Sequence, residues 1–224
     1  MIVLKEKPLE ETLENLSESR KVLIAGCNGC AGIYQVGGEK QTVMTAKLLE
    51  MAGKLRGKSW EFTTATTLRQ CDGQIVATTL KPVAESCDTI LSLACGVGVQ
   101  TLVEAFGDKV VVPGNDTMFL GSQDRELAAF HERCRACGDC VLYETGGICP
   151  VTRCAKSLMN GPCGGMSNGK CEVGGWKKDC AWILIFNRLN QLKRMDSFTV
   201  FRPPRDFRVS QPPRELGTIP EEAK

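Results

Sequence analysis

The sequence has little histidine, few aromatic residues and no long apolar run. Of its 224 residues, 6% are aromatic and one is a histidine, His131. A single histidine excludes Cys2His2 zinc sites and histidine-based acid–base catalysis, so any metal would be held mainly by thiolates. No stretch approaches the about 18 apolar residues of a transmembrane helix, and Lys5, Glu6 and Lys7 stand where a signal peptide is apolar. We therefore expect a cytoplasmic protein without membrane insertion.

An excess of charge of one sign is also lacking. The chain has 28 basic and 26 acidic residues, which gives a formal net charge of +2. Nucleic-acid binding usually needs a clear basic surface, so we expect no such partner. Cysteine, in contrast, is abundant at 13 residues. In a reducing cytoplasm, dense cysteine indicates metal ligation or thiol redox chemistry more often than disulfides.

The first half alternates short apolar runs with stretches of helical periodicity. This alternation predicts an α/β fold, a Rossmann-like parallel sheet of about four strands. The expected strands are 21–25, 59–63, 89–94 and 109–113, and the expected helices are 9–20, 39–53, 73–86 and 99–106.

The second half has a different composition. Residues 131–180 contain eight cysteines and nine glycines, against eight residues of Val, Ile, Leu, Met and Phe together. Such a segment cannot build an adequate apolar core. Inside a cell, a bound metal is the available means of stabilising its fold. We expect a closing helix over 181–195 with Asp179 as N-cap, then a Pro-rich extended tail that is either disordered or wrapped around a partner. The predicted domains are 1–125, 126–196 and 197–224.

Four cysteines of the first half follow predicted strands. Cys27 and Cys30 come directly after the first strand, Cys71 follows the second and Cys95 follows the third. The carboxyl ends of parallel strands share one edge, so the four thiols are expected to converge there. Thiols on glycine-rich loops favour a [4Fe–4S] cluster, with structural zinc or no metal as alternatives. Cys87 precedes its strand, at the opposite edge, and is expected to be structural.

Two other interpretations use the same turn. A thioredoxin-like dithiol at Cys27 and Cys30 is weaker, because further glycines follow before any helical run. A dinucleotide-binding loop would need the GxGxxG spacing, which this turn lacks, and it would leave Cys71 and Cys95 unexplained.

In the second half, Cys134, Cys137 and Cys140 have the Cys-x2-Cys-x2-Cys spacing of bacterial ferredoxins. Cys149 is followed by proline, as the fourth ferredoxin cysteine is, but after eight residues instead of three. We expect either two [4Fe–4S] clusters or one cluster and a zinc, and the spacing does not decide which cysteines pair. His131, three residues before Cys134, could complete a site, but it is expected to be a surface helix residue. The remaining cysteines are Cys154, Cys163, Cys171 and Cys180.

The motifs carry a resemblance to a known family. The stretch CRACGDCVLYETGGICPVTRCAKSLMNGPCGG over 134–165, with GKCE at 169–172 and DCAW at 179–182, resembles the cysteine-rich domain named after methylenetetrahydrofolate reductase. With AGCNGCAG, LRQCDG and LACGVGVQ of the first half, residues 20–196 are similar to the MetV family. Its members are the small iron–sulfur subunits of two-subunit methylenetetrahydrofolate reductases of acetogens and related anaerobes.

The resemblance implies a non-catalytic subunit of an oxidoreductase complex. Such a subunit would relay electrons, through one cluster in the first half and one or two in the second, to the flavin of a separate catalytic subunit. A ferredoxin, a heterodisulfide-reductase-like module or an NADH-oxidising subunit would be the electron donor. Two alternatives stay open: a zinc-stabilised scaffold without a redox role, and a stand-alone thiol oxidoreductase.

Overall fold

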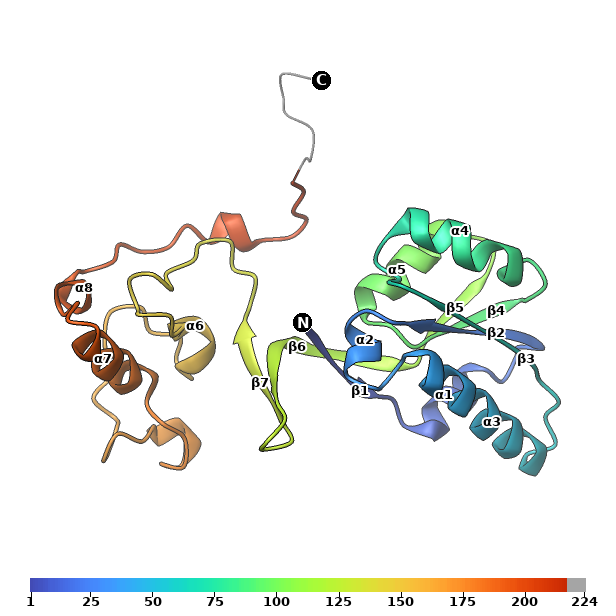
Figure 1. Ribbon diagram of the computed structural model, residues 1–224, viewed down its shortest axis with the longest axis horizontal. Helices are drawn as coiled ribbons and strands as arrows, with labels where there is room; N and C mark the ends of the chain where they lie inside the picture. The colour runs from blue at the N-terminus through green and yellow to red at the C-terminus, as the bar shows by residue number, and fades with distance from the viewer. Residues whose placement is uncertain (217–224) are drawn as a thin grey trace, which may run out of the picture. The chain divides into compact units, whose positions relative to one another are not determined.

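The computed structural model describes residues 1–216 (Figure 1). The chain divides into two compact units, Met1–Ser122 and Gln123–Lys224, which we call unit 1 and unit 2. Residues 197–216, the described part of the predicted tail, thus belong to unit 2. Within the described range, no helix is both long and apolar enough to cross a membrane.

Unit 1 contains the predicted parallel sheet. Its four strands lie in the order β3-β2-β4-β5, and all neighbouring pairs are parallel. Strands β2, β4 and β5 are short and apolar, as the sequence indicated, whereas β3 is rich in threonine and lies at 61–67 instead of the predicted 59–63. The α/β class is confirmed. The strands are β2 (Lys21–Cys27), β3 (Glu61–Thr67), β4 (Thr89–Ser92) and β5 (Val110–Pro113).

Helices cover both faces of this sheet, because side chains alternate between the two faces of each strand. Leu23 of β2 packs with α4 and α5, whereas its neighbours Val22 and Ile24 pack with α1 and α3. Figure 1 shows α4 and α5 on one side of the sheet and α1 and α3 on the other. The helices are α1 (Leu9–Asn15), α2 (Cys30–Ile33), α3 (Glu39–Leu55), α4 (Gly73–Ala84) and α5 (Gly96–Ala105).

Unit 1 also has an antiparallel pair that the sequence did not predict. Strand β1 (Ile2–Glu6) pairs with β6 (Asn115–Asp124), with Glu6 opposite Asn115. β6 is mostly half-buried and shows no alternation of apolar and polar residues. The period that identifies a strand is therefore missing from its sequence.

Unit 2 has little regular structure. Its core is formed by Trp182, Ile185 and Leu189 of α7, against which Phe198 of α8 packs. The predicted closing helix therefore covers its own unit with its apolar face. The elements are β7 (Ala129–Cys134), α6 (Pro150–Arg153), the 3-10 helix η1 (Glu172–Gly174), α7 (Ala181–Gln191), α8 (Asp196–Thr199) and the 3-10 helix η2 (Phe207–Ser210).

Three details of unit 2 differ from expectation. Asp179 does not cap α7: its carboxylate accepts a hydrogen bond from Lys170 Nζ at 2.6 Å, and the helix begins after Cys180. His131 lies on strand β7 and not on a helix. The predicted tail is attached to its own unit, since Asn160 and Arg202 exchange two hydrogen bonds of 2.8 and 2.9 Å. Residues 217–224 of that tail lie outside the described range.

Candidate metal centres

The carboxyl edge of the parallel sheet collects thiols of the first half. Cys27 is the last residue of β2, and Cys95 follows β4 and is the N-cap residue of α5. Both are buried and pack in one cluster with Leu4, Ala31 and Ala94. The exposed Cys71 follows β3 and immediately precedes Asp72, the N-cap of α4.

The thiol of Cys27 is influenced by two other thiols of this edge. Burial raises the pKa of the Cys27 thiol most strongly, the backbone N–H groups of Gln70 and Gly29 lower it, and the thiols of Cys95 and Cys71 raise it further. Cys27 is therefore close enough to both other cysteines for their charges to interact. These N–H groups are donors of the kind that stabilise sulfur bound to a metal.

Cys30, the fourth predicted thiol of this edge, opens the one-turn helix α2. Its Sγ accepts a hydrogen bond of 3.4 Å from the backbone N–H of Ile2 on strand β1. Its charge acts on Tyr34, whose pKa is raised first by burial and then by Cys30. The unpredicted strand β1 therefore contributes a donor to the predicted site.

Helix starts and close packing shape this edge. Helices α4 and α5 begin one to two residues after Cys71 and Cys95, so the positive ends of their dipoles face the region of the thiols. A Cβ at Gly98 would lie 2.8 Å from the Cβ atoms of both Ala94 and Gln70. Only glycine permits α5 to approach the Gln70 turn this closely.

Gln70 is a supporting residue that the sequence did not reveal. It is fully buried, and its Nε2 donates to the carbonyl oxygens of Ala25 and Gly26 at 2.8 and 3.0 Å. Its Oε1 accepts from Ser92 Oγ at 2.7 Å. One side chain thus joins the ends of β2 and β4 beside the thiols. The only sign of this role in the sequence is that Gln70 directly precedes Cys71. A glutamine at that position belongs to no known motif, so its role could not be predicted.

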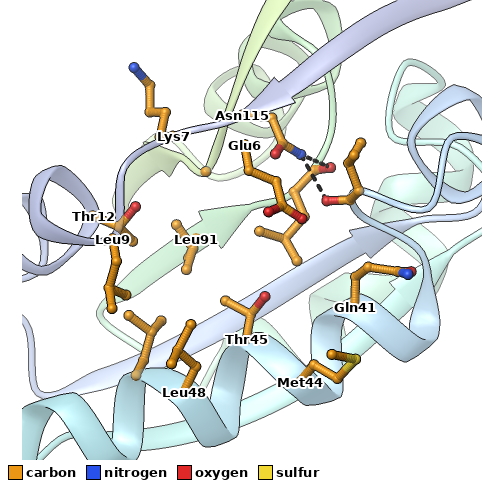
Figure 2. A pocket seen from close by; sticks show the side chains of 14 residues that line it. Glu6, Lys7, Leu9, Thr12, Gln41, Met44, Thr45, Leu48, Leu91 and Asn115 are labelled. Carbon is orange, nitrogen blue, oxygen red and sulfur yellow. Dashed lines mark hydrogen bonds between the residues drawn. The ribbon is translucent and has the colours of Figure 1, made fainter. Parts of the chain in front are cut away.

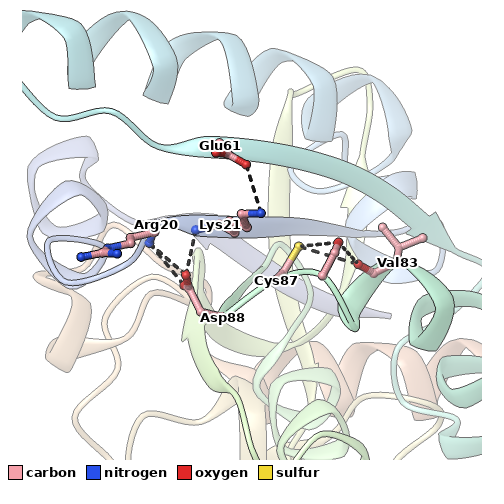
Figure 3. A network of polar contacts seen from close by, with 7 residues as sticks. Arg20, Lys21, Glu61, Val83, Cys87 and Asp88 are labelled. Carbon is pink, nitrogen blue, oxygen red and sulfur yellow. Dashed lines mark hydrogen bonds and ion pairs between the residues drawn. The ribbon is translucent and has the colours of Figure 1, made fainter.

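Cys87 lies at the other end of the strands. It belongs to the buried core that α4 and α5 form with Leu23, and Lys109 Nζ donates to its carbonyl oxygen at 2.9 Å. Nearby, the Asp88 carboxylate accepts from the backbone N–H groups of Lys21 and Arg20 at 2.8 and 3.1 Å (Figure 3). This network closes the amino edge of the sheet.

In unit 2, the Cys-x2-Cys-x2-Cys loop begins at the end of β7. The backbone N–H of Ala136 donates to Cys134 Sγ at 3.3 Å, which folds the loop back on its first thiol. Arg205, from the predicted tail, donates from Nη2 to Cys137 Sγ at 3.2 Å and from Nε to Asp139 at 3.2 Å. Burial would raise the pKa of Cys137, but the N–H of Asp139 and the Arg205 guanidinium hold it below its ordinary value.

Cys149 approaches this loop through helix α6. It is the N-cap residue of α6, and Thr152 Oγ1 on that helix donates to the carbonyl oxygen of Arg133 at 3.3 Å. Because Arg133 directly precedes Cys134, the contact holds Cys149 near the start of the loop. Cys140 is exposed.

The last four cysteines line one small cavity. It has a volume of about 20 Å³, and Trp182, Ala181 and Met166 are among its other walls. Residues far apart in the sequence are thereby brought to one place, which spacing alone could not show. The four are Cys154, Cys163, Cys171 and Cys180.

The donor sets can be compared with the predicted groups. Among residues 1–216, no three Cys, His, Asp or Glu side chains stand in an arrangement that would hold a metal ion. The thiols of Cys27, Cys71 and Cys95 nevertheless share one edge, together with N–H donors and helix starts. Their chemistry fits a thiolate-bound metal or cluster.

Unit 1 contains a further cavity of about 400 Å³ (Figure 2). Thr45 of α3 and Glu6 of β1 point into it from opposite sides, above apolar residues such as Leu91. Asn115 Nδ2 donates to the carbonyl oxygen of Leu93 at 2.7 Å, whereas the buried Oδ1 of Asn115 has no hydrogen-bond partner. No motif marks this cavity, since its walls come from separate segments.

The comparisons with known proteins concern mainly unit 2. Residues 112–208 match a family described as "Methylene-tetrahydrofolate reductase C terminal". This similarity supports a relation to methylenetetrahydrofolate reductase. The matched range contains the eight cysteines of unit 2, covers less than half of the chain and excludes the thiols of the parallel sheet. No curated protein and no solved structure matches the chain.

Proposed function

We propose that this chain is an iron–sulfur electron-transfer subunit of a methylenetetrahydrofolate reductase complex, of the MetV type. The observation that supports the proposal best is that Cys27, Cys71 and Cys95 stand at or after the carboxyl ends of the neighbouring parallel strands β2, β3 and β4. The match of residues 112–208 to the reductase's C-terminal family supplies the context. The catalytic partner would be a separate flavin-bearing subunit, and the electron donor a ferredoxin, a heterodisulfide-reductase-like module or an NADH-oxidising subunit.

The thiols would be divided between two cluster sites. Cys27, Cys71 and Cys95, with Cys30, would hold one [4Fe–4S] cluster in unit 1, and Cys134, Cys137, Cys140 and Cys149 would hold another in unit 2. When bound, such clusters exchange single electrons at potentials that the protein adjusts.

The chain's own groups would adjust those potentials and limit the access of water. Backbone N–H groups of Gln70 and Gly29 lower the charge density at Cys27 Sγ, and the N–H of Ile2 does so at Cys30 Sγ. Arg205 does the same at Cys137 Sγ. Leu4, Ala31 and Ala94 pack around Cys27 and Cys95 and exclude water there. Donors to sulfur and low exposure are two of the means by which proteins set a cluster's potential.

A stand-alone thiol oxidoreductase is the weaker function. Its attacking cysteine would need a lowered pKa and access to a substrate. Burial instead raises the pKa of Cys27, which is 7% exposed. That thiol therefore lacks both properties of a reactive dithiol.

Iron and acid-labile sulfide, counted together with EPR spectra after anaerobic purification, test the proposal. We expect Cys71→Ser to lose the iron of one cluster, because it removes one of the converging thiols. Cys87→Ser is the matched control, since it removes a buried thiol from the opposite edge and should keep all iron. Full iron in Cys71→Ser, or a colourless wild-type protein without iron, would contradict the proposal.

A further inference from the structure

We propose that Cys154, Cys163, Cys171 and Cys180 form one structural zinc site that holds the second half of unit 2 together. The site is separate from the two proposed cluster sites and does not depend on electron transfer. Spacing could not pair these cysteines with one another, and the inference rests on the single cavity that all four line.

The backbone places two of the four cysteines on one face of a short antiparallel bridge. Lys170 and Asp179 form an isolated antiparallel bridge, and the residues that follow them are Cys171 and Cys180. Cys171 N–H donates to the carbonyl oxygen of Lys178, and Cys180 N–H donates to that of Gly169, both at 2.8 Å. Cys171 is therefore opposite Lys178 and Cys180 opposite Gly169, so these hydrogen bonds fix the two cysteines diagonally across the bridge, on the same face of it.

The other two cysteines reach the same cavity from helix α6 and from the loop after it. Cys154 directly follows α6, and Cys163 lies in a glycine-rich stretch whose Gly161 and Gly164 have positive φ angles of 94° and 82°. Such angles suit glycine and let the loop fold sharply back toward α7. The buried Trp182 forms one wall of the cavity and anchors it, because its Nε1 donates to Leu158 at 3.0 Å.

The chemistry of the cavity fits a single ion held by four thiolates. The cavity has a volume of about 20 Å³, which admits roughly one water-sized atom. Four thiolates at about 2.3 Å are the donor set of a structural zinc site. Among the described residues no three such side chains already stand in ligating geometry, so the thiols would close in on the ion as it binds. Glu172 lies at the rim, paired with Lys156, and its Oε1 accepts a hydrogen bond from Cys163 Sγ at 3.6 Å.

This part of the chain needs such an ion for its stability. None of residues 151–180, all of which the structure describes, is buried. Thirteen of these thirty residues are half-buried and the rest are exposed, so the segment gains little from the hydrophobic effect to offset its conformational entropy. In small domains of this kind, metal binding supplies the folding free energy.

Metal analysis of the full chain, purified anaerobically, tests the inference. We expect one zinc per chain in the wild type, and Cys163→Ser to lose that zinc while keeping its iron. Cys134→Ser is the matched variant from the other loop: it should lose iron and keep zinc. If Cys163→Ser lost iron, or if it kept its zinc, the inference would be overturned.

A second measurement needs no variant, in case Cys163→Ser does not fold. Zinc-edge X-ray absorption of the wild type should show four sulfur neighbours at about 2.3 Å. Oxygen or nitrogen neighbours, or a protein without zinc, would overturn the site. A protein with zinc but no iron would contradict the electron-transfer proposal and support this zinc site. Failure of the one proposal can therefore be distinguished from failure of the other.

Discussion

The two units of this chain are stabilised in different ways. Within the described residues, five buried apolar side chains lie in unit 2, four of them on α7, and all the others lie in unit 1. Unit 1 buries both faces of a parallel sheet under helices, which is a sufficient core for a stable domain. Unit 2 has eight cysteines where unit 1 has leucines, valines and isoleucines. The comparison teaches that the same chain uses burial in one half and, on our proposal, metal–sulfur bonds in the other.

Removal of metal should have the largest effect on this comparison. Chelation under anaerobic conditions is expected to unfold the second half of unit 2, because a structural zinc contributes about 10–16 kcal/mol in zinc-finger peptides. The parallel sheet of unit 1 should stay folded. Hydrogen exchange followed by mass spectrometry would show lost protection in 151–180 and retained protection in β2 and β4. Equal loss in both units would contradict the difference between them.

The substitution Leu80→Ala is the corresponding test of burial in unit 1. Leu80 is fully buried between α4 and the sheet, so the cavity should lower the free energy of unfolding by about 2–5 kcal/mol. We expect the same loss with and without metal in unit 2, measured by denaturant titration. Leu55→Ala is the control, because Leu55 is 90% exposed. A loss that disappears on chelation would show that the two units are not independent.

The substitution Gln70→Ala should have a smaller effect that sharpens the comparison within unit 1. It removes the side-chain donor to the carbonyl oxygens of Gly26 and Ala25, of which Ala25 keeps the N–H of Leu93 at 2.9 Å, at a cost of about 1–3 kcal/mol. It also removes the link between β2 and β4 beside the thiols, so the EPR signal of the unit 1 cluster should change. Gln100→Ala, on the exposed face of α5, is the matched control. An unchanged EPR signal in Gln70→Ala would mean that the link does not position Cys27.

Asp88→Asn should have the smallest effect, and one that depends on pH. Although burial opposes it, the N–H groups of Lys21 and Arg20 and the hydroxyl of Thr89 hold the pKa of Asp88 below its ordinary value of 3.8. The carboxylate therefore stabilises unit 1 fully above that value, and the contribution is lost as pH falls through the lower folded pKa. The variant should be less stable than wild type at neutral pH and equal to it in strong acid. Thermal unfolding measured as a function of pH checks this prediction. Glu85→Gln is the control variant.

Much of unit 1 could be predicted, because its elements follow local rules. Strands β2, β4 and β5 are apolar runs, and helices such as α3 and α4 have the expected period and lie close to the predicted ranges. Strand β3 is rich in threonine, and its predicted range was shifted. Strands β1 and β6 escaped prediction because their pairing joins residues more than a hundred positions apart. The contact of Ile2 with Cys30 depends on that pairing and was therefore also missed.

The candidate sites divide in the same manner. The shared edge of Cys27, Cys71 and Cys95 follows from strand order, which the βαβ pattern indicates. The roles of Gln70 and Arg205 could not be read from sequence, because each acts on residues distant in the chain. For Asp179 the prediction was wrong in the opposite way. Local rules predicted a helix N-cap at this residue, but its carboxylate pairs with Lys170 instead.

The sequence by itself determined the α/β class of unit 1, the edge at which its thiols lie and the poverty of unit 2 in apolar residues. These depend on composition and on short-range periodicity. Only the tertiary structure decided that Cys154, Cys163, Cys171 and Cys180 surround one cavity and that the tail binds its own unit. The physical reason is that unit 2 has long irregular loops without a repeating pattern. Which of its cysteines meet is set by a few bridging hydrogen bonds and by glycine turns, and not by any period of the sequence.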